Sequence, residues 1–212
     1  MVFKNREEAS RLLSSKLNDF KKNKDLLIIA IPRGGVVLGK IISKSLKASL
    51  DIIVIKKIGA PQNPELAIGA IGQERTIYWD RNLCERLNIS KTQMKDLKNR
   101  EGEVRSRRES ILREERILPE IKNKTVILVD DGVATGATVI CAQKYLKKKK
   151  AKKIILAVPV ISKETLENIK QYFDRVIFLD VVENFYAVGQ FYKNFPQVSD
   201  EEVIGILASS VI

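Results

Sequence analysis

Short runs of aliphatic residues alternate along this chain with segments whose apolar residues recur at helical spacing. Continuous apolar runs of this kind are typical of strands buried on both faces of a parallel sheet. Such strands, joined by helices through right-handed crossovers, form a sheet covered by helices on both sides. The pattern predicts an α/β fold with about five parallel strands. The expected strands are 26–31, 52–55, 125–129, 154–158 and 176–179, and the expected helices are 5–20, 36–46, 137–149 and 163–172.

Two segments interrupt this alternation. Residues 58–79 hold two prolines and several glycines among short apolar runs, which predicts a mobile loop and a β-hairpin. Residues 91–118 predict a long charged helix with a narrow apolar stripe, lying across its own domain or a partner subunit. The stripe recurs every seven residues and consists of Leu97, Val104, Ile111 and Leu118. We expect one domain over 1–212, with a core of about 22–57 and 120–182, insertions over about 58–119 and a C-terminal extension over about 183–212.

The C-terminal extension is rich in aromatic residues. Five of the twelve phenylalanines and tyrosines fall within 183–195. They could form a satellite cluster that packs the extension onto the sheet, or a platform on which a flat base stacks. A final helix is expected near Ser199, with Glu202 completing a capping box.

The segment 126–138, VILVDDGVATGAT, combines a buried strand, an acidic pair and a loop of small residues. The acids fall at the carboxyl end of a parallel strand, where open α/β sheets bind ligands. The loop leads into a helix, whose free N-terminal N–H groups favour a phosphate. Because carboxylates repel phosphate, the combination indicates a ligand with phosphate at one end and hydroxyls or a metal at the other, such as a sugar phosphate. The structural alternative is an ordinary turn capped by Asp131.

Composition removes several classes of chemistry. The chain has no histidine, which excludes histidine bases, histidine-assisted nucleophiles and most zinc sites, so a metal would be a hard cation held by oxygens. Its two cysteines are expected as free thiols. No apolar run approaches the roughly 18 residues of a membrane span, and the N-terminus has no secretory pattern, so we expect a cytoplasmic protein with no membrane partner.

The net charge of +12 raises the question of nucleic acid. Most of the excess is lysine in short clusters near 21–24 and 147–153. No aromatic residues interleave with these lysines, so a nucleic-acid partner is not expected. A basic field would also attract a highly anionic small substrate.

A second anion site is expected after the first strand, at Pro32-Arg33-Gly34-Gly35. The glycines let backbone N–H groups approach an anion closely, and Arg33 offers a bidentate guanidinium. Alone this would be an ordinary turn. Together with 126–138, in this order, it resembles the type I phosphoribosyltransferases, which bind 5-phosphoribosyl 1-pyrophosphate (PRPP). The stretches 59–69 and 185–190 look most like a prokaryotic group of predicted phosphoribosyltransferases.

The resemblance implies a Rossmann-like parallel sheet with a flexible loop at 58–79 and a C-terminal hood at 183–195. By position, Asp130 and Asp131 would hold the ribose hydroxyls, directly or through Mg²⁺, the one cofactor implied. The PRPP loop would comprise Asp130, Asp131, Gly132, Val133, Ala134, Thr135, Gly136, Ala137 and Thr138. Pyrophosphate would be bound by Arg33, Gly34 and Gly35, with Lys56 or Lys57 as a further cation, through a loop with a cis peptide near Pro32–Arg33.

The implied reaction is transfer of phosphoribose to a nitrogenous base, with release of pyrophosphate. Arg33 would stabilise the leaving group, and Phe185 and Tyr186 are candidates for contacting the base. Ala134 stands where the 6-oxopurine enzymes have an aspartate, which is closer to the adenine and uracil branches. Glu65 is the one carboxylate we nominate as a general base. The family also implies a homodimer.

Two other interpretations stay open. A regulator could keep the fold and sense PRPP without turnover, with its positive charge serving nucleic acid. The reaction could also run in reverse, as phosphorolysis or hydrolysis of a phosphorylated ribose.

Overall fold

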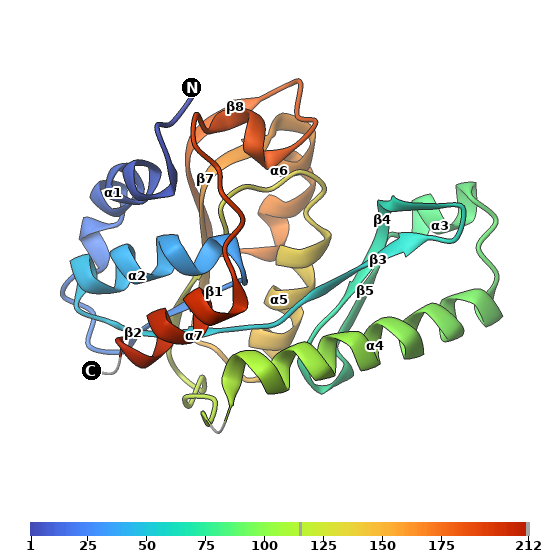
Figure 1. Cartoon of the computed structure of the whole chain (residues 1–212), viewed down its shortest axis with the longest axis horizontal. Coiled ribbons are helices and arrows are strands. Elements are labelled where there is room, and N and C mark those ends of the chain that lie inside the picture. The colour runs from blue at the N-terminus through green and yellow to red at the C-terminus, as the bar shows by residue number, and fades with distance from the viewer. Residues whose placement is uncertain (115, 211–212) are drawn as a thin grey trace.

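The computed structural model describes residues 1–114 and 116–210 (Figure 1). Its core is a five-stranded sheet in the order β2-β1-β6-β7-β8, and every neighbouring pair is parallel. The strands are β1 (Leu26–Ala30), β2 (Ser49–Ile52), β6 (Thr125–Val129), β7 (Lys153–Ser162) and β8 (Arg175–Val182). The predicted α/β architecture is confirmed.

Helices cover both faces of this sheet (Figure 1). One face carries α1 (Arg6–Lys16), α2 (Gly34–Leu46) and α7 (Asp200–Ala208), and the other carries α5 (Ala137–Lys148) and α6 (Lys163–Ile169). Short 3₁₀ turns lie at Asn18–Phe20, Gln73–Arg75, Lys170–Tyr172 and Val188–Phe191. The described part of the chain contains no helix long and apolar enough to cross a membrane.

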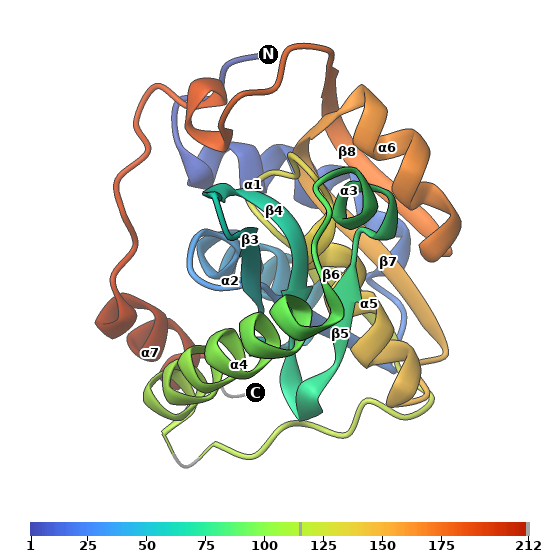
Figure 2. The same ribbon diagram turned by 90° about the vertical axis from the view of Figure 1, so that its right-hand side faces the viewer.

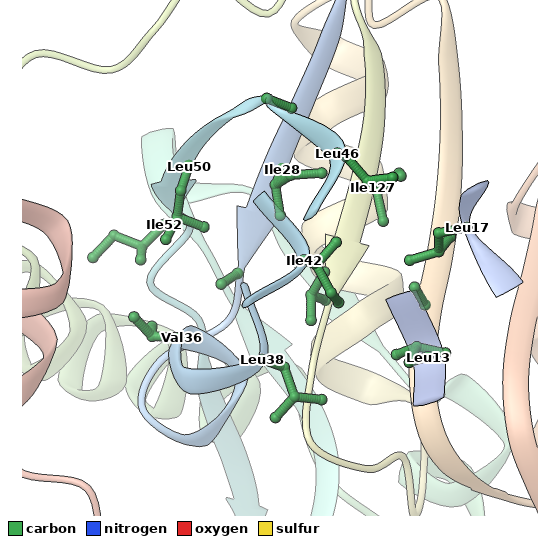
Figure 3. Close-up of a cluster of buried hydrophobic side chains, with 14 of the residues drawn as sticks. Leu13, Leu17, Ile28, Val36, Leu38, Ile42, Leu46, Leu50, Ile52 and Ile127 are labelled. Carbon is green, nitrogen blue, oxygen red and sulfur yellow. The ribbon is translucent and has the colours of Figure 1, made fainter. Parts of the chain in front are cut away.

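The continuous apolar runs are explained by this two-sided burial. In β1, Ile28 packs with the α1–α2 layer, whereas Leu27 and Ile29 pack with the α5–α6 layer. Figure 3 shows the first layer, where Leu13 and Ile42 belong to the same buried cluster as Ile28. Each such side chain contributes about 1.5–3 kcal/mol through burial, so a strand with two apolar faces is stable only between two helical layers.

The strand predicted at 52–55 is wrong in its bounds, because β2 spans Ser49–Ile52 and the next strand already begins at Lys56. The misleading residue is Asp51, which breaks the apolar pattern yet lies buried inside β2. Arg113 makes this burial tolerable, since its Nη2 lies 2.5 Å from Asp51 Oδ1. That partner lies far along the chain and is invisible to local periodicity.

Between β2 and β6 the chain forms a separate arm (Figure 1). A three-stranded antiparallel sheet consists of β3 (Lys56–Ala60), β4 (Asn63–Ile71) and β5 (Ile77–Trp79), followed by α3 (Arg81–Arg86) and α4 (Lys91–Arg113). Figure 2 shows α4 crossing this sheet. The predicted hairpin is confirmed, and α4 lies across its own domain. Mobility of 58–79 stays a prediction.

The helix predicted over 91–118 ends earlier, at Arg113, because Glu114 leaves the helix with a positive φ of 48°. Leu118 therefore lies outside it. The proposed stripe is not a buried seam either: Leu97 is buried against the small sheet, but Val104 and Ile111 are 39% and 55% exposed. An unsupercoiled helix rotates a seven-residue repeat by about 20° per heptad, so it does not keep such a stripe on one side.

The C-terminal extension packs as an aromatic cluster on the N-terminal segment. The Tyr192 ring lies 5.5 Å from Phe3 and 4.9 Å from Phe195, centroid to centroid. The structural interpretation of these aromatics is thus confirmed. The capping box at the start of α7 is also confirmed, with Ser199 and Glu202 bonding each other's backbone N–H groups.

Candidate functional site

The two predicted ligand loops lie side by side at the carboxyl edge of the sheet. Strand β1 pairs directly with β6, with Ala30 opposite Val129, so the chain segments that follow them leave the sheet together. Both loops line one cleft of about 310 Å³. Its walls are formed by Ile31, Pro32, Arg33, Gly34, Ile55, Lys56, Lys57, residues 130–136, Thr138 and Val188.

The loop after β6 presents a row of backbone N–H donors. The Val133 N–H donates to Val160 and the Ile140 N–H to Gly136, but within the described chain no hydrogen bond is made by the backbone N–H groups of 134–138. Gly136 has a φ of +79°, a conformation that few other residues adopt, and this turns the chain into α5. A row of free N–H groups at a helix N-terminus is suited to a phosphate.

The acidic pair is held in two different ways. Asp130 Oδ1 accepts a hydrogen bond of 2.9 Å from the Asp131 N–H, and Asp131 Oδ2 accepts one of 2.9 Å from Arg6 Nε. Burial and the neighbouring Asp131 charge raise the pKa of Asp130 well above its usual range. Burial also raises the pKa of Asp131, and the Arg6 guanidinium opposes this rise. The negative charge of Asp130 is therefore less compensated by neighbouring groups than that of Asp131.

The loop after β1 carries the second predicted anion site. The Pro32–Arg33 peptide bond is cis, as the family resemblance implies. The Arg33 guanidinium is about one-third exposed and lies 3.7 Å from Asp200 Oδ1 at the start of α7. Because this contact is long and partly solvated, Arg33 can reorient toward an anion in the cleft at little cost.

Of the two candidate lysines, Lys57 is the better placed to act in the cleft. Both line it, and both belong to β3. Lys56 lies 4.0 Å from Glu101 of α4, whereas Lys57 is exposed and its charge favours the ionised form of Asp130, lowering the pKa of that carboxyl.

Five predicted site residues are not among those that line the cleft: Gly35, Ala137, Glu65, Phe185 and Tyr186. Glu65 is exposed near the hairpin turn of β4, so the structure does not bring this candidate base to the acidic pair. Phe185 packs against Phe191 with ring centroids 4.9 Å apart, and Tyr186 is 87% exposed. The hood side chain that does line the cleft is Val188. Contact of Phe185 or Tyr186 with the base stays a prediction.

Sequence reasoning missed two residues that hold the acidic pair. Arg6 begins α1, and Tyr192 lies in the hood. The Tyr192 hydroxyl donates a 2.7 Å hydrogen bond to the Asp131 carbonyl. Burial and the Asp131 charge raise the pKa of Tyr192, so it stays a donor. Neither residue belongs to a motif, and each reaches Asp131 from a distant part of the chain.

A parallel sheet that carries a phosphate loop and acidic pair on one strand and an anion loop on its neighbour defines a phosphoribosyltransferase-type protein. Comparison with known families agrees: the phosphoribosyl transferase domain matches residues 3–195. The chain therefore belongs to the phosphoribosyl transferase domain family.

Individual relatives support this assignment. A Mycobacterium tuberculosis protein, provisionally named a phosphoribosyl transferase, is 34% identical over 206 residues, covering 97% of this chain but 46% of its own length. The chain thus spans about half of that relative. The crystal structure of TT1426 from Thermus thermophilus is 32% identical, with a TM-score of 0.83 and 99% of each chain covered. A purine phosphoribosyltransferase from Pyrococcus horikoshii is 19% identical, covers 90% of this chain and 87% of its own with a TM-score of 0.50, and shares the fold.

Proposed function

We propose that this protein transfers 5-phosphoribose from PRPP to a nitrogenous base, with Mg²⁺ as cofactor and pyrophosphate as the leaving product. The observation that carries the proposal is the joining of three features in one cleft: free N–H groups at 134–138, two carboxylates, and the loop at 32–35. A ligand with phosphate at one end, ribose hydroxyls in the middle and pyrophosphate at the other matches all three.

The roles follow from position in the cleft. The N–H groups and hydroxyls of 134–138 bind the 5-phosphate, and Asp130 and Asp131 bind the ribose hydroxyls. Arg33, the 34–35 backbone and Lys57 bind pyrophosphate. The backbone N–H groups are held in place by the fold, and Arg33 can turn toward the anion, so these groups and Lys57 stabilise charge as it grows on the leaving oxygen.

The donor set is compatible with Mg²⁺ shared with the ligand. Only oxygens are on offer, and no cluster of three or more acidic, cysteine or histidine side chains in the described residues could hold a metal alone. Mg²⁺ is commonly bound by one or two carboxylates together with substrate phosphates, and Asp130 forms no ion pair within the part of the chain that the structure describes. When bound, the ion would offset negative charge on pyrophosphate.

The chemistry is a displacement at the anomeric carbon. The bond from C1 to the pyrophosphate oxygen breaks, and that oxygen keeps the electron pair. A bond forms from C1 to the acceptor nitrogen, which then gives up a proton. Among the described residues, the carboxylates that line the cleft are Asp130 and Asp131, and both are assigned to the ribose, so the proton would pass to pyrophosphate or water. Val188 and Ala134 offer an apolar surface for the acceptor.

We also propose a homodimer. The family resemblance supports it, and the exposed Val104 and Ile111 on α4 provide an apolar contact surface. Sedimentation velocity at micromolar concentration tests this, and a monomer throughout would contradict it.

One incubation tests the reaction. The purified protein is mixed with PRPP, Mg²⁺ and a pool of purine and pyrimidine bases, and products are identified by mass spectrometry. A base-dependent nucleotide mass is expected. The variant D130N/D131N should yield no product and bind no PRPP by calorimetry while remaining folded. PRPP binding without any nucleotide would favour a PRPP-sensing regulator, and absence of PRPP binding would refute the proposal.

A further inference from the structure

The strongest unexplained feature near the cleft is a buried arginine outside both ligand loops. Arg6, the first residue of α1, is only 7% exposed. Its Nε donates to Asp131 Oδ2 at 2.9 Å, and its Nη1 donates to the Pro196 carbonyl at 2.8 Å. Its guanidinium carbon lies 3.7 Å from the centroid of the Phe195 ring. This cation is therefore held between Asp131 and the Phe195–Pro196 segment.

Burying a cation is costly unless a charged partner compensates it, and Asp131 is that partner. The pairing is selective, because Arg6 forms an ion pair with Asp131 and not with Asp130 within the described chain. Tyr192 adds a second restraint by bonding the Asp131 carbonyl. Asp131 is thus held by residues from both ends of the chain, whereas Asp130 is bonded only within its own loop.

This arrangement matters for an anionic ligand. Two adjacent carboxylates face the same cleft as the phosphate loop, and each would repel a polyphosphate. Arg6 offsets one of these charges from an adjoining pocket of about 310 Å³, which shares Arg33, Gly34, Asp131 and Val188 with the cleft, and it is not itself among the residues that line the cleft. It also fixes the Asp131 side chain in one orientation, with Oδ2 turned toward the guanidinium.

We propose that Arg6 is a positioning residue for the PRPP site, which acts through Asp131 by offsetting its charge and fixing its orientation. The inference rests on the proposed function. It divides the acidic pair into a preorganised member, Asp131, and a less compensated member, Asp130. It also makes PRPP affinity depend on a residue that does not belong to either ligand loop.

The test measures PRPP affinity in the presence of Mg²⁺ by titration calorimetry. R6M should bind PRPP at least tenfold more weakly than the wild type, because Asp131 loses its counter-charge. R6K should recover part of this loss, since it keeps the charge but not the Nε geometry. R11M is the matched control: Arg11 lies on the same helix and is exposed, so its removal should change the affinity less than twofold.

A double-mutant cycle separates positioning from simple structural support. D131N alone should weaken PRPP binding by about tenfold, but adding R6M to D131N should change the affinity less than twofold, because a neutral amide needs no counter-charge. If R6M weakens PRPP binding as much in the D131N background as in the wild type, Arg6 acts through Pro196 or Phe195 and the inference is refuted. Should R6M fail to fold, R6K is measured in the same cycle. Its loss of PRPP affinity should likewise disappear in the D131N background.

PRPP binding by the wild type distinguishes failure of the Arg6 inference from failure of the proposed function. PRPP binding by the wild type, with R6M and R6K unchanged in affinity, would refute the role of Arg6 alone. No binding by the wild type would refute the proposed function and this inference together.

Discussion

Gly34 and Asp131 are packed so closely that no side chain fits between them. A Cβ built on Gly34 would lie 1.7 Å from Asp131 Oδ2 and 2.5 Å from its Cγ. The glycine of the anion loop therefore does more than expose its N–H group. It leaves the space in which Asp131 meets Arg6, so the two ligand loops depend on each other sterically.

G34A should disturb the site through this contact. The added methyl group must displace the Asp131 carboxylate from Arg6, and overpacking of this kind costs about 1–3 kcal/mol of folding free energy. Urea unfolding should reveal that loss, and calorimetry should show weaker PRPP binding. G205A is the control, because a Cβ there meets nothing within 4 Å and lies inside α7, where alanine is favoured over glycine by about 1 kcal/mol. Equal stability of G34A and the wild type would contradict the packing argument.

T135A should weaken ligand binding without affecting folding. Thr135 is exposed and lines the cleft, so its hydroxyl contributes little to packing. Loss of a hydrogen bond to a charged phosphate costs about 1.5–3 kcal/mol. PRPP titration should show this loss, while the urea midpoint stays unchanged. An unaltered affinity would remove this hydroxyl from the phosphate site.

R113M should destabilise the protein by about 3–5 kcal/mol at pH 7, because it leaves the buried Asp51 carboxylate without its partner. Burial raises the pKa of Asp51 and Arg113 opposes this, so removing Arg113 raises that pKa further. A raised pKa in the folded state means that the folded protein takes up the proton first, so stability is regained as the pH falls. The deficit relative to the wild type should shrink between pH 7 and pH 5 in urea unfolding.

The companion variant D51N/R113M removes both buried charges. It should recover most of the stability lost in R113M, since the uncompensated carboxylate is the main cost. A double variant as unstable as R113M, at every pH, would show that the Arg113 bond to the Ile52 carbonyl is what matters instead.

Neither thiol should react in the native protein. Cys84 and Cys141 are both buried, and burial raises the pKa of Cys141 to about 12 and that of Cys84 in the same direction. The thiolate is the reactive form, and about one Cys141 thiol in ten thousand is ionised at pH 8. DTNB should label no thiol in buffer and two in guanidinium chloride. Rapid labelling of Cys141 without denaturant would mean that α5 opens locally.

The contiguous features were accessible to sequence reasoning. Residues 126–138 contain the strand, the acids, the glycine and the helix start in one stretch, and each is dictated by neighbours within a few positions. The anion loop at 32–35 is likewise determined by residues within a few positions of one another. The bounds of β2 were not predicted, because they depend on a distant partner: Asp51 is buried in this strand next to Arg113. The end of α4 at Arg113 rather than at 118 was not predicted either.

By itself, the sequence determined the alternation of strands and helices, the two ligand loops and the family they resemble, because burial periodicity and loop chemistry are short-range properties. Tertiary structure alone decided which side chains surround the acids. Arg6 and Tyr192 reach Asp131 from opposite ends of the chain, and Val188 lines the cleft in place of Phe185 and Tyr186. Such pairings are set by how the layers pack around the sheet, which brings residues together regardless of their distance in sequence.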